Sequence, residues 1–564
     1  MRKIEGSPFP LGTERREGGI NFAVEVPKGK KCELLLYKRG ALLPEISVEM
    51  DENDSTGAIR SLFLADLPED VCEYNYRIEE EIFVDPYVKK LAGTEKFGET
   101  WDLQSGRIRG VLYKDVYDWQ GDKRPDIPMN RVVAYSLHVR GFTRHASSRV
   151  KHRGTFSGIQ EKLPYLQELG INQIHCMPVY EFEPSSKYIN YWGYGPGYYF
   201  APKAAYASGD PVTEFKDMVK ACHRAGIEVI LEMPFEGSVR RIYMTDCLRH
   251  YMQEYHVDGF ILNPEVTPVD GVYGDPMLSG LKLLKHQTGF QNVMRRFLKG
   301  DEGMVGDVIY WLRHQAGREG YYNYITNHNG FTLYDLVSYD AKHNELNGEN
   351  NQDGPDYNYS WNCGAEGPSR KKAVTALREG QMKNAFFLVL LAQGTPCILA
   401  GDEFANTQKG NNNVYCQDNA TAWLDWSRLD REKELFTFVK QLILLRKEHP
   451  VLAQKEELRG MDQISCGVPD VSYHGEYAWQ TPSEIFSRQL GVYYCGKMAG
   501  DADCFAAYNM HWLEHSFALP ALPKGKKWFL KADTKEGILQ EESLLENQRE
   551  AVLKERTIAF FVAR

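Results

Sequence analysis

The spacing of hydrophobic and polar positions divides the chain into three parts. In residues 1–118 the apolar positions form short runs, and the run at 20–26 alternates with polar neighbours. Such alternation is typical of a strand with one buried face, and clusters of Gly, Pro, Asp and Asn separate the runs as turns do. This pattern predicts a small β-sandwich over residues 1–118, followed by a polar linker at 119–128.

From residue 129 to 452, strand-like apolar runs alternate with helical spacing. The expected strands are 132–139, 171–177, 227–233 and 259–263, and the expected helices are 158–169, 212–225 and 242–256. This order predicts parallel strands joined by right-handed crossovers, so an α/β fold with a (β/α)8 TIM barrel fits residues 129–452 best. An open doubly wound sheet is the alternative, but no glycine-rich phosphate loop follows any of these strands. Short alternating runs return after residue 452 and predict an antiparallel C-terminal β-sandwich over 453–564.

Composition and charge limit the classes of binding partner and the cellular compartment that we expect. The chain has 564 residues, a formal net charge of −10 and no basic stripe, which argues against nucleic acid and anionic membranes as partners. No apolar run reaches the roughly 18 residues of a membrane helix, and residues 1–8 lack the apolar core of a signal peptide. The eleven cysteines form no C-x-x-C pair, so we expect reduced thiols in the cytoplasm, without a disulfide framework, a metal site or a cofactor.

Several motifs follow one another along the chain. They are Pro-Leu-Gly-Thr at 10–13, Gly-Ile-Asn-Phe-Ala-Val at 19–24, His-Val-Arg-Gly-Phe-Thr at 138–143, Tyr-Trp-Gly-Tyr at 191–194, His-Asn-Gly-Phe-Thr-Leu at 328–333, His-Asn-Glu-Leu-Asn-Gly-Glu-Asn at 343–350, Gly-Asp-Glu at 401–403 and Asn-Asn-Asn-Val-Tyr-Cys-Gln-Asp-Asn at 411–419. Together they resemble the isoamylase and glycogen-debranching branch of glycoside hydrolase family 13, in the α-amylase superfamily, over essentially the whole chain. The resemblance implies a role in α-glucan metabolism and an N-terminal domain like the family 48 carbohydrate-binding modules.

The family's catalytic carboxylates are replaced in this chain. Retaining hydrolysis of a glucan needs a carboxylate nucleophile and a carboxylic acid about 5–5.5 Å apart. The resemblance places Asn263 at the nucleophile, His286 at the general acid and Asn329 at the third carboxylate, while Ile261 replaces the supporting arginine. An amide carries no charge and is a poor nucleophile, so we expect these positions to be non-functional.

Other carboxylates near the expected site were considered as substitutes. Glu265 lies two residues beyond Asn263, but Pro264 between them makes a nucleophile's geometry unfavourable. Glu232 and Glu236 follow the third strand, which supplies neither nucleophile nor acid in the family, and we expect hydrogen-bonded or solvated carboxylates there. A histidine at position 286 can donate a proton near neutral pH, but an acid without a nucleophile or base achieves little.

The resemblance also implies an irregular barrel. It aligns residues 280–287 with the family's fifth strand, and residues 287–289 alone then precede the helical spacing of 290–299. A parallel crossover needs about a dozen residues, so the sixth strand must be shortened, displaced or supplied by 304–310. We therefore expect irregularity around strands five and six.

Three functions remain open on the sequence. The favoured one is a catalytically inactive, debranching-enzyme-like protein that binds α-glucan such as glycogen or amylopectin, or that pairs with an active debranching homologue. The second is an active hydrolase with unorthodox acid and base groups, and the third is a structural interaction protein with a filled site. For the first, the resemblance implies that glucan contacts come from Trp192, Tyr194, Phe235, His328, Asn344 and Asn413.

Overall fold

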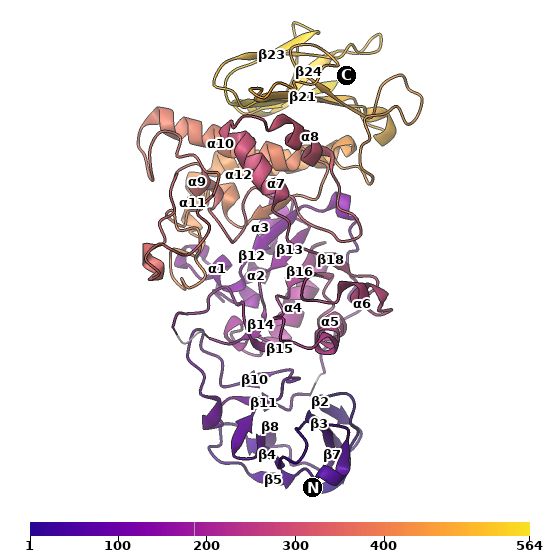
Figure 1. Ribbon diagram of the computed structural model, residues 1–564, viewed down its shortest axis with the longest axis vertical. Coiled ribbons are helices and arrows are strands. Elements are labelled where there is room, and N and C mark those ends of the chain that lie inside the picture. Colours follow the sequence, from indigo (N-terminus) through magenta and orange to yellow (C-terminus); the bar gives the residue numbers. More distant parts are fainter. Residues whose placement is uncertain (115, 185–186) are drawn as a thin grey trace.

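The computed structural model describes residues 1–114, 116–184 and 187–564. Figure 1 shows an elongated molecule, with an N-terminal β domain at one end, a barrel of strands and helices in the middle and a C-terminal β domain at the other end. None of the helices in the described part has the length and apolarity that a membrane span requires. The three-part division follows the hydrophobic pattern, while the domain boundaries remain a prediction.

The N-terminal domain packs two antiparallel sheets face to face. One sheet has the order β1-β7-β3-β2 with β6 beside β7, and the other has the order β10-β11-β8-β4-β5 with β9 beside β8. The bounds are β1 Arg2–Glu5, β2 Gly12–Arg16, β3 Gly19–Glu25, β4 Cys32–Lys38, β5 Ile46–Glu49, β6 Ser55–Thr56, β7 Ile59–Ala65, β8 Val71–Ile78, β9 Glu81–Phe83, β10 Leu91–Ala92 and β11 Arg109–Val111. The alternating apolar positions of β3, β4 and β8 form the buried layer between the sheets.

The central domain is a β/α barrel. Six parallel strands have the order β18-β17-β16-β13-β12-β19, with bounds β12 Ala134–Leu137, β13 Gln173–Cys176, β16 Glu228–Glu232, β17 Gly259–Ile261, β18 Lys282–Leu284 and β19 Cys397–Leu399. The helices outside them are α2 Phe156–Glu161, α3 Leu163–Leu169, α4 Pro211–Arg224, α5 Arg241–Tyr255, α6 Val269–Gly274, α7 Gly289–Lys299, α8 Val305–Arg313, α10 Lys372–Leu390 and α12 Lys433–Glu448. The helix expected over 158–169 is two helices, because Pro164 lies in the first turn of α3 and has no N–H to continue α2.

The irregularity expected around strands five and six is confirmed. In the described chain one irregular segment, 320–326, closes the ring between β18 and β19, through parallel bridges from Gly320 to Leu284 and from Asn323 to Pro396. Tyr322 and Tyr324 lie in the apolar cluster inside the barrel with residues of β12, β16, β17, β18 and β19. The Tyr322 hydroxyl donates to Oε1 of Gln173 on β13, 2.6 Å away. The barrel wall thus consists of six strands and one irregular segment, one fewer than the eight strands of a regular barrel. The side chains of Tyr322 and Tyr324 fill the space inside it.

The C-terminal domain contains a six-stranded sheet and a two-stranded sheet, all antiparallel. The order of the large sheet is β20-β21-β22-β27-β24-β25, and β23 pairs with β26. The bounds are β20 Val471–His474, β21 Gln489–Tyr494, β22 Cys504–Asn509, β23 His515–Ala518, β24 Trp528–Asp533, β25 Gly537–Leu544, β26 Glu550–Leu553 and β27 Thr557–Ala563. This sheet packs on α10 and α12, on the barrel side that faces the top of Figure 1.

Candidate functional site

The polar centre of the barrel mouth is Glu232, the last residue of β16. Its side chain is buried, and both carboxylate oxygens have partners. Oε1 lies 2.8 Å from Nε2 of His286 and accepts the Tyr194 hydroxyl, and Oε2 lies 3.0 Å from Nε2 of His175. The partners come from β13, from the end of β18 and from the loop between β14 (Tyr180–Phe182) and β15 (Gly197–Pro202). Both oxygens are therefore engaged in hydrogen bonds within the protein.

The electrostatics of this cluster favour an ionised Glu232. Burial alone would raise the pKa of Glu232, but the charge of His286 and the hydrogen bonds from His175 and His286 outweigh it and hold that pKa well below its usual range. Burial works against protonation of His286, yet the Glu232 carboxylate raises the pKa of His286 above its ordinary value. The two groups therefore form an ion pair at the mouth of the barrel.

His328 completes the cluster as a neutral ring. Burial lowers the pKa of His328 to about 4. Its Nε2 lies 2.9 Å from the Tyr194 hydroxyl. The Tyr194 hydroxyl donates its single proton to Glu232, so it can only accept a hydrogen bond from His328. The neutral imidazole of His328 is therefore protonated on Nε2.

At the family's catalytic positions the structure places neutral or paired groups. Asn263 follows β17 and is exposed, and its Oδ1 accepts the backbone N–H of Glu265 at 3.0 Å. Asn329 is also exposed and lies in the loop after the irregular segment 320–326. Ile261, in place of the expected arginine, is buried among the apolar residues inside the barrel. Its register partner on β16 is Glu232, so position 261 stands beside the carboxylate at the centre of the mouth.

Of the carboxylates considered as substitutes, Glu265 and Glu236 are not part of the ion pair. Glu265 is exposed in the turn after β17, and Glu236 is half-buried in the loop after β16. The Glu265 contact to Asn263 is made by its backbone rather than by its carboxylate. Glu232 is hydrogen-bonded, as expected, although its position at the centre of the mouth was not foreseen.

Aromatic rings form a continuous row from the ion pair to the rim. The centroid separations are 6.1 Å from His286 to His328, 5.0 Å from His328 to Trp192, 6.4 Å from Trp192 to Tyr415 and 6.3 Å from Tyr415 to Tyr188. The rings of Tyr194, Tyr415 and Tyr188 are half-exposed. Planar rings at a polar mouth can stack on the C–H faces of sugars.

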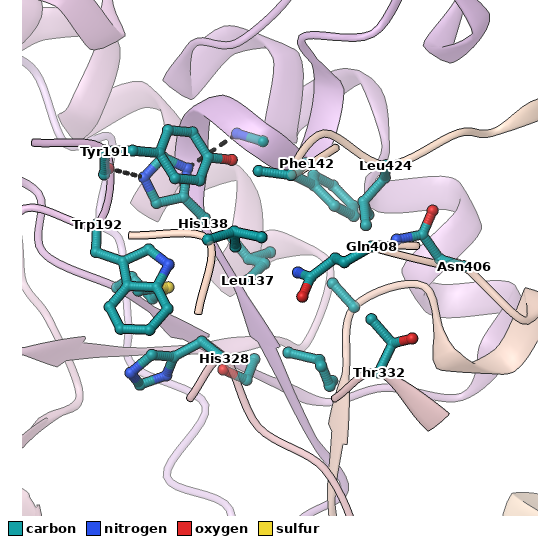
Figure 2. Close-up of a pocket in the computed structure, with 17 residues that line it drawn as sticks. Leu137, His138, Phe142, Tyr191, Trp192, His328, Thr332, Asn406, Gln408 and Leu424 are labelled. Carbon is teal, nitrogen blue, oxygen red and sulfur yellow. Dashed lines mark hydrogen bonds between the residues drawn. The ribbon is translucent and has the colours of Figure 1, made fainter. Parts of the chain in front are cut away.

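A small cavity lies beside this row. Its volume is about 50 Å³, and its lining includes His138, Phe142, Trp192, His328 and Gln408. Figure 2 shows the Trp192 and His328 rings together at one edge of this cavity, with His138 and Tyr191 next to Trp192. A space of this size has room for a few water molecules, not for a sugar ring.

The remaining residues expected to contact glucan lie elsewhere. Phe235 is buried in the main apolar core, with its ring 5.0 Å from Tyr199. Asn344 is buried and joins two loops: its Nδ2 donates to Oδ1 of Asn412 at 2.8 Å, and its Oδ1 accepts the backbone N–H of Asn412 at 2.9 Å. The Asn413 side chain donates to Oδ2 of Asp353 at 2.9 Å. The structure thus brings Trp192, Tyr194, His328 and His286 together, while the other three side chains are engaged in packing or loop bonds.

Sequence reasoning missed His175, Tyr415 and Tyr188. The signal for His175 was a polar side chain near the end of the expected strand 171–177, between Ile174 and Cys176, and that strand neighbours β16. Tyr188 and Tyr415 are separated by more than two hundred residues in the chain, and no local pattern predicts that their rings meet.

Comparison with known proteins identifies the relatives of this chain. The model of the α-amylase catalytic domain matches residues 139–237. A "Glycogen operon protein GlgX homolog" from Mycobacterium bovis is 30% identical over 685 aligned positions, covering 94% of this chain and 93% of the relative. "Isoamylase 1, chloroplastic" from Arabidopsis thaliana is 31% identical over 79% of this chain and 75% of its own. The first alignment is longer than the chain itself, so that relative has insertions that this chain lacks.

Solved structures show the same fold. Pullulanase type I from Bacillus subtilis, complexed with maltose, superimposes with a TM-score of 0.76 at 17% identity, covering 99% of this chain and 86% of the pullulanase. A likeness at this identity concerns the fold alone, whereas the curated relatives extend over nearly the whole sequence. The chain therefore belongs to the isoamylase and glycogen-debranching branch of glycoside hydrolase family 13, within the α-amylase superfamily.

Proposed function

We propose that this family member has lost hydrolysis and acts by binding α-glucan, either alone or as the partner of an active debranching homologue. The observation that carries the proposal is the state of Glu232, whose two oxygens are engaged by His175, His286 and Tyr194. Its pKa lies well below the usual range, so it cannot supply a proton to a leaving oxygen.

The groups around Glu232 do not replace the missing chemistry. A retaining mechanism needs a nucleophile that forms a covalent bond to the anomeric carbon, and Asn263 offers a neutral amide. A general acid by itself typically contributes only about 10²–10⁴-fold to a rate. The contact with the Glu232 carboxylate also favours the protonated form of His286, which opposes transfer of that proton to a substrate. Loss of nucleophile, acid and third carboxylate together supports the absence of turnover.

Glucan binding is supported by the row of aromatic rings. His328, Trp192, Tyr415 and Tyr188 follow one another at 5.0–6.4 Å between centroids and at 70–87° between ring planes, so the half-exposed rings of Tyr415 and Tyr188 would each contact a sugar singly. The B. subtilis pullulanase of the same fold is a complex with maltose. We propose glycogen, amylopectin or malto-oligosaccharide as ligands and the cytoplasm as the compartment, which the eleven unpaired thiols support.

Affinity electrophoresis in gels with glycogen or amylopectin tests the proposal, together with release of reducing ends. We expect retarded migration and no reducing ends above a heat-inactivated control. Tyr415→Ala should weaken binding about 10-fold, equivalent to about 1.4 kcal/mol, because it removes a half-exposed ring from the row. Tyr477→Ala is the matched control, since Tyr477 is an exposed tyrosine of the C-terminal domain. Unretarded migration of the wild type would instead favour an interaction protein with a filled site.

The second candidate is a hydrolase that uses His286 and Glu232 as an acid–base pair. The observation in its favour is their 2.8 Å contact at the mouth of the barrel. It predicts reducing ends from preparations free of host amylase, and their loss in His286→Ala or Glu232→Gln. Turnover that persists through purification would overturn the inactive assignment.

A further inference from the structure

Three potential metal ligands converge between the barrel and the C-terminal domain. His449 follows α12, whereas Cys504 is the first residue of β22 and Asp501 lies in the turn before it. Nδ1 of His449 is 3.1 Å from Oδ1 of Asp501 and 3.8 Å from Sγ of Cys504, and all three atoms lie within 4.8 Å of one another. The side chains are almost fully buried.

The spacing of these atoms suits a tetrahedral ion. Zinc bonds are about 2.3 Å to thiolate and about 2.0–2.2 Å to imidazole or carboxylate, so two ligands of one tetrahedral ion lie about 3.3–3.6 Å apart. The observed 3.1 and 3.8 Å differ from this range by a few tenths of an ångström. Small rotations of the side chains would bring all three atoms to bonding distance of a common centre.

The same geometry argues against nucleophilic catalysis by Cys504. In a Cys-His-Asp triad the thiol and the carboxylate use different nitrogens of the imidazole. Here both contact Nδ1 of His449, and Cys504 has no exposed surface through which a substrate could reach it. Convergence on one nitrogen is expected of ligands arranged around a common ion.

Backbone groups orient the carboxylate of this cluster. Oδ1 of Asp501 accepts the backbone N–H of Ala502 at 2.7 Å, and Oδ2 accepts that of Val451 at 3.3 Å. Hydrogen bonds of this kind position metal ligands in proteins. The Val451 contact also links the segment after α12 to the C-terminal domain.

We propose that His449, Asp501 and Cys504 form a structural site for zinc or a similar divalent transition metal, which joins the barrel to the C-terminal domain. Imidazole, thiolate and carboxylate are each zinc ligands; most structural zinc sites have four protein ligands, so here a water molecule would complete the tetrahedron. On binding, the Cys504 thiol gives its proton to solvent and the thiolate bonds to the metal.

The test uses the full chain, stripped with chelator and titrated with Co²⁺ and then Zn²⁺. We expect one equivalent of Co²⁺ to give a thiolate-to-cobalt charge-transfer band and tetrahedral d–d bands, which Zn²⁺ displaces, and Zn²⁺ to raise the unfolding temperature. Cys504→Ser should abolish the charge-transfer band, and both it and Asp501→Asn should weaken affinity at least about 100-fold, beyond the usual effect of losing an outer-shell partner.

Cys222→Ser is the control, because Cys222 is another fully buried thiol, on α4 in the barrel. It should bind Co²⁺ as the wild type does. Circular dichroism of each variant separates loss of the site from loss of the fold, and Asp501→Asn provides a second variant if Cys504→Ser unfolds. The proposal would be overturned if the wild type gave no thiolate band and stoichiometric Zn²⁺ had no effect on unfolding. His449, Asp501 and Cys504 would then be a cluster of hydrogen-bonded side chains without a metal.

Discussion

Replacing Glu232 by glutamine should destabilise the barrel in a pH-dependent way. The glutamine side chain keeps the shape of Glu232 but offers one acceptor oxygen where the carboxylate has two, and its NH2 group would face the donors of His175 or His286. The structure gives the carboxylate three polar partners, Tyr194, His175 and His286. The charge of His286 is the strongest influence that lowers the pKa of Glu232, although 44% of the His286 side chain is exposed and water screens the pair.

We expect a loss of about 2–4 kcal/mol, given the usual cost of leaving buried donors to a charged group unsatisfied. The pKa of Glu232 is lowered by folding, so its contribution is present above about pH 4.3 and is lost as the pH falls further. The pKa of His286 is raised by folding, so its contribution is complete below about pH 6.5 and is lost as the pH rises through the folded value. The difference between wild type and variant should therefore be largest between about pH 4.5 and 6.5.

Urea unfolding at pH 5.5 and pH 8.5, followed by tryptophan fluorescence and circular dichroism, measures this difference. Glu265→Gln is the matched control, because that carboxylate is exposed and should change stability by no more than about 0.5 kcal/mol. If Glu232→Gln and Glu265→Gln behave alike at pH 5.5, Glu232 is not the centre of the mouth and the argument for an inactive site loses its main support.

Three further predictions concern the barrel. Gly259→Ala should abolish soluble expression or lower the unfolding temperature strongly, because a Cβ there would meet the backbone oxygen of Lys282 at 2.1 Å; Gly274→Ala, with no atom within 4 Å, is the control. Burial raises the pKa of Asp402 to about 7, so this carboxyl favours folding less as the pH rises from about 4 to 7; Asp402→Asn should flatten the change in unfolding temperature across that range. The triple variant Asn263→Asp, His286→Glu and Asn329→Asp should release no more than trace reducing ends from glycogen, because residue 261 remains isoleucine in place of the family's supporting arginine. Turnover near that of an active isoamylase would contradict this.

Local patterns in the sequence were sufficient for the overall plan. The change from alternating to β-α order at residue 129 predicted the barrel, since the period of apolar positions depends on which face of each element is buried. The short segment 287–289 indicated the irregular closure, because a crossover cannot be made with so few residues. Motifs that resemble the family located Asn263, His286 and Asn329, whose side-chain chemistry is independent of the details of packing.

Only the tertiary structure determined which side chains meet. Residue 232 is separated from His175 by 57 positions and from His286 by 54, and the spacing of apolar residues carries no information on such pairs. For the same reason Phe235, expected to contact glucan, lies against Tyr199 in the core. His449 meets Asp501 and Cys504 from 52 and 55 positions away, a separation that no short ligand motif in the sequence indicates. Periodicity follows from local burial, whereas side-chain clusters depend on how distant segments pack in three dimensions.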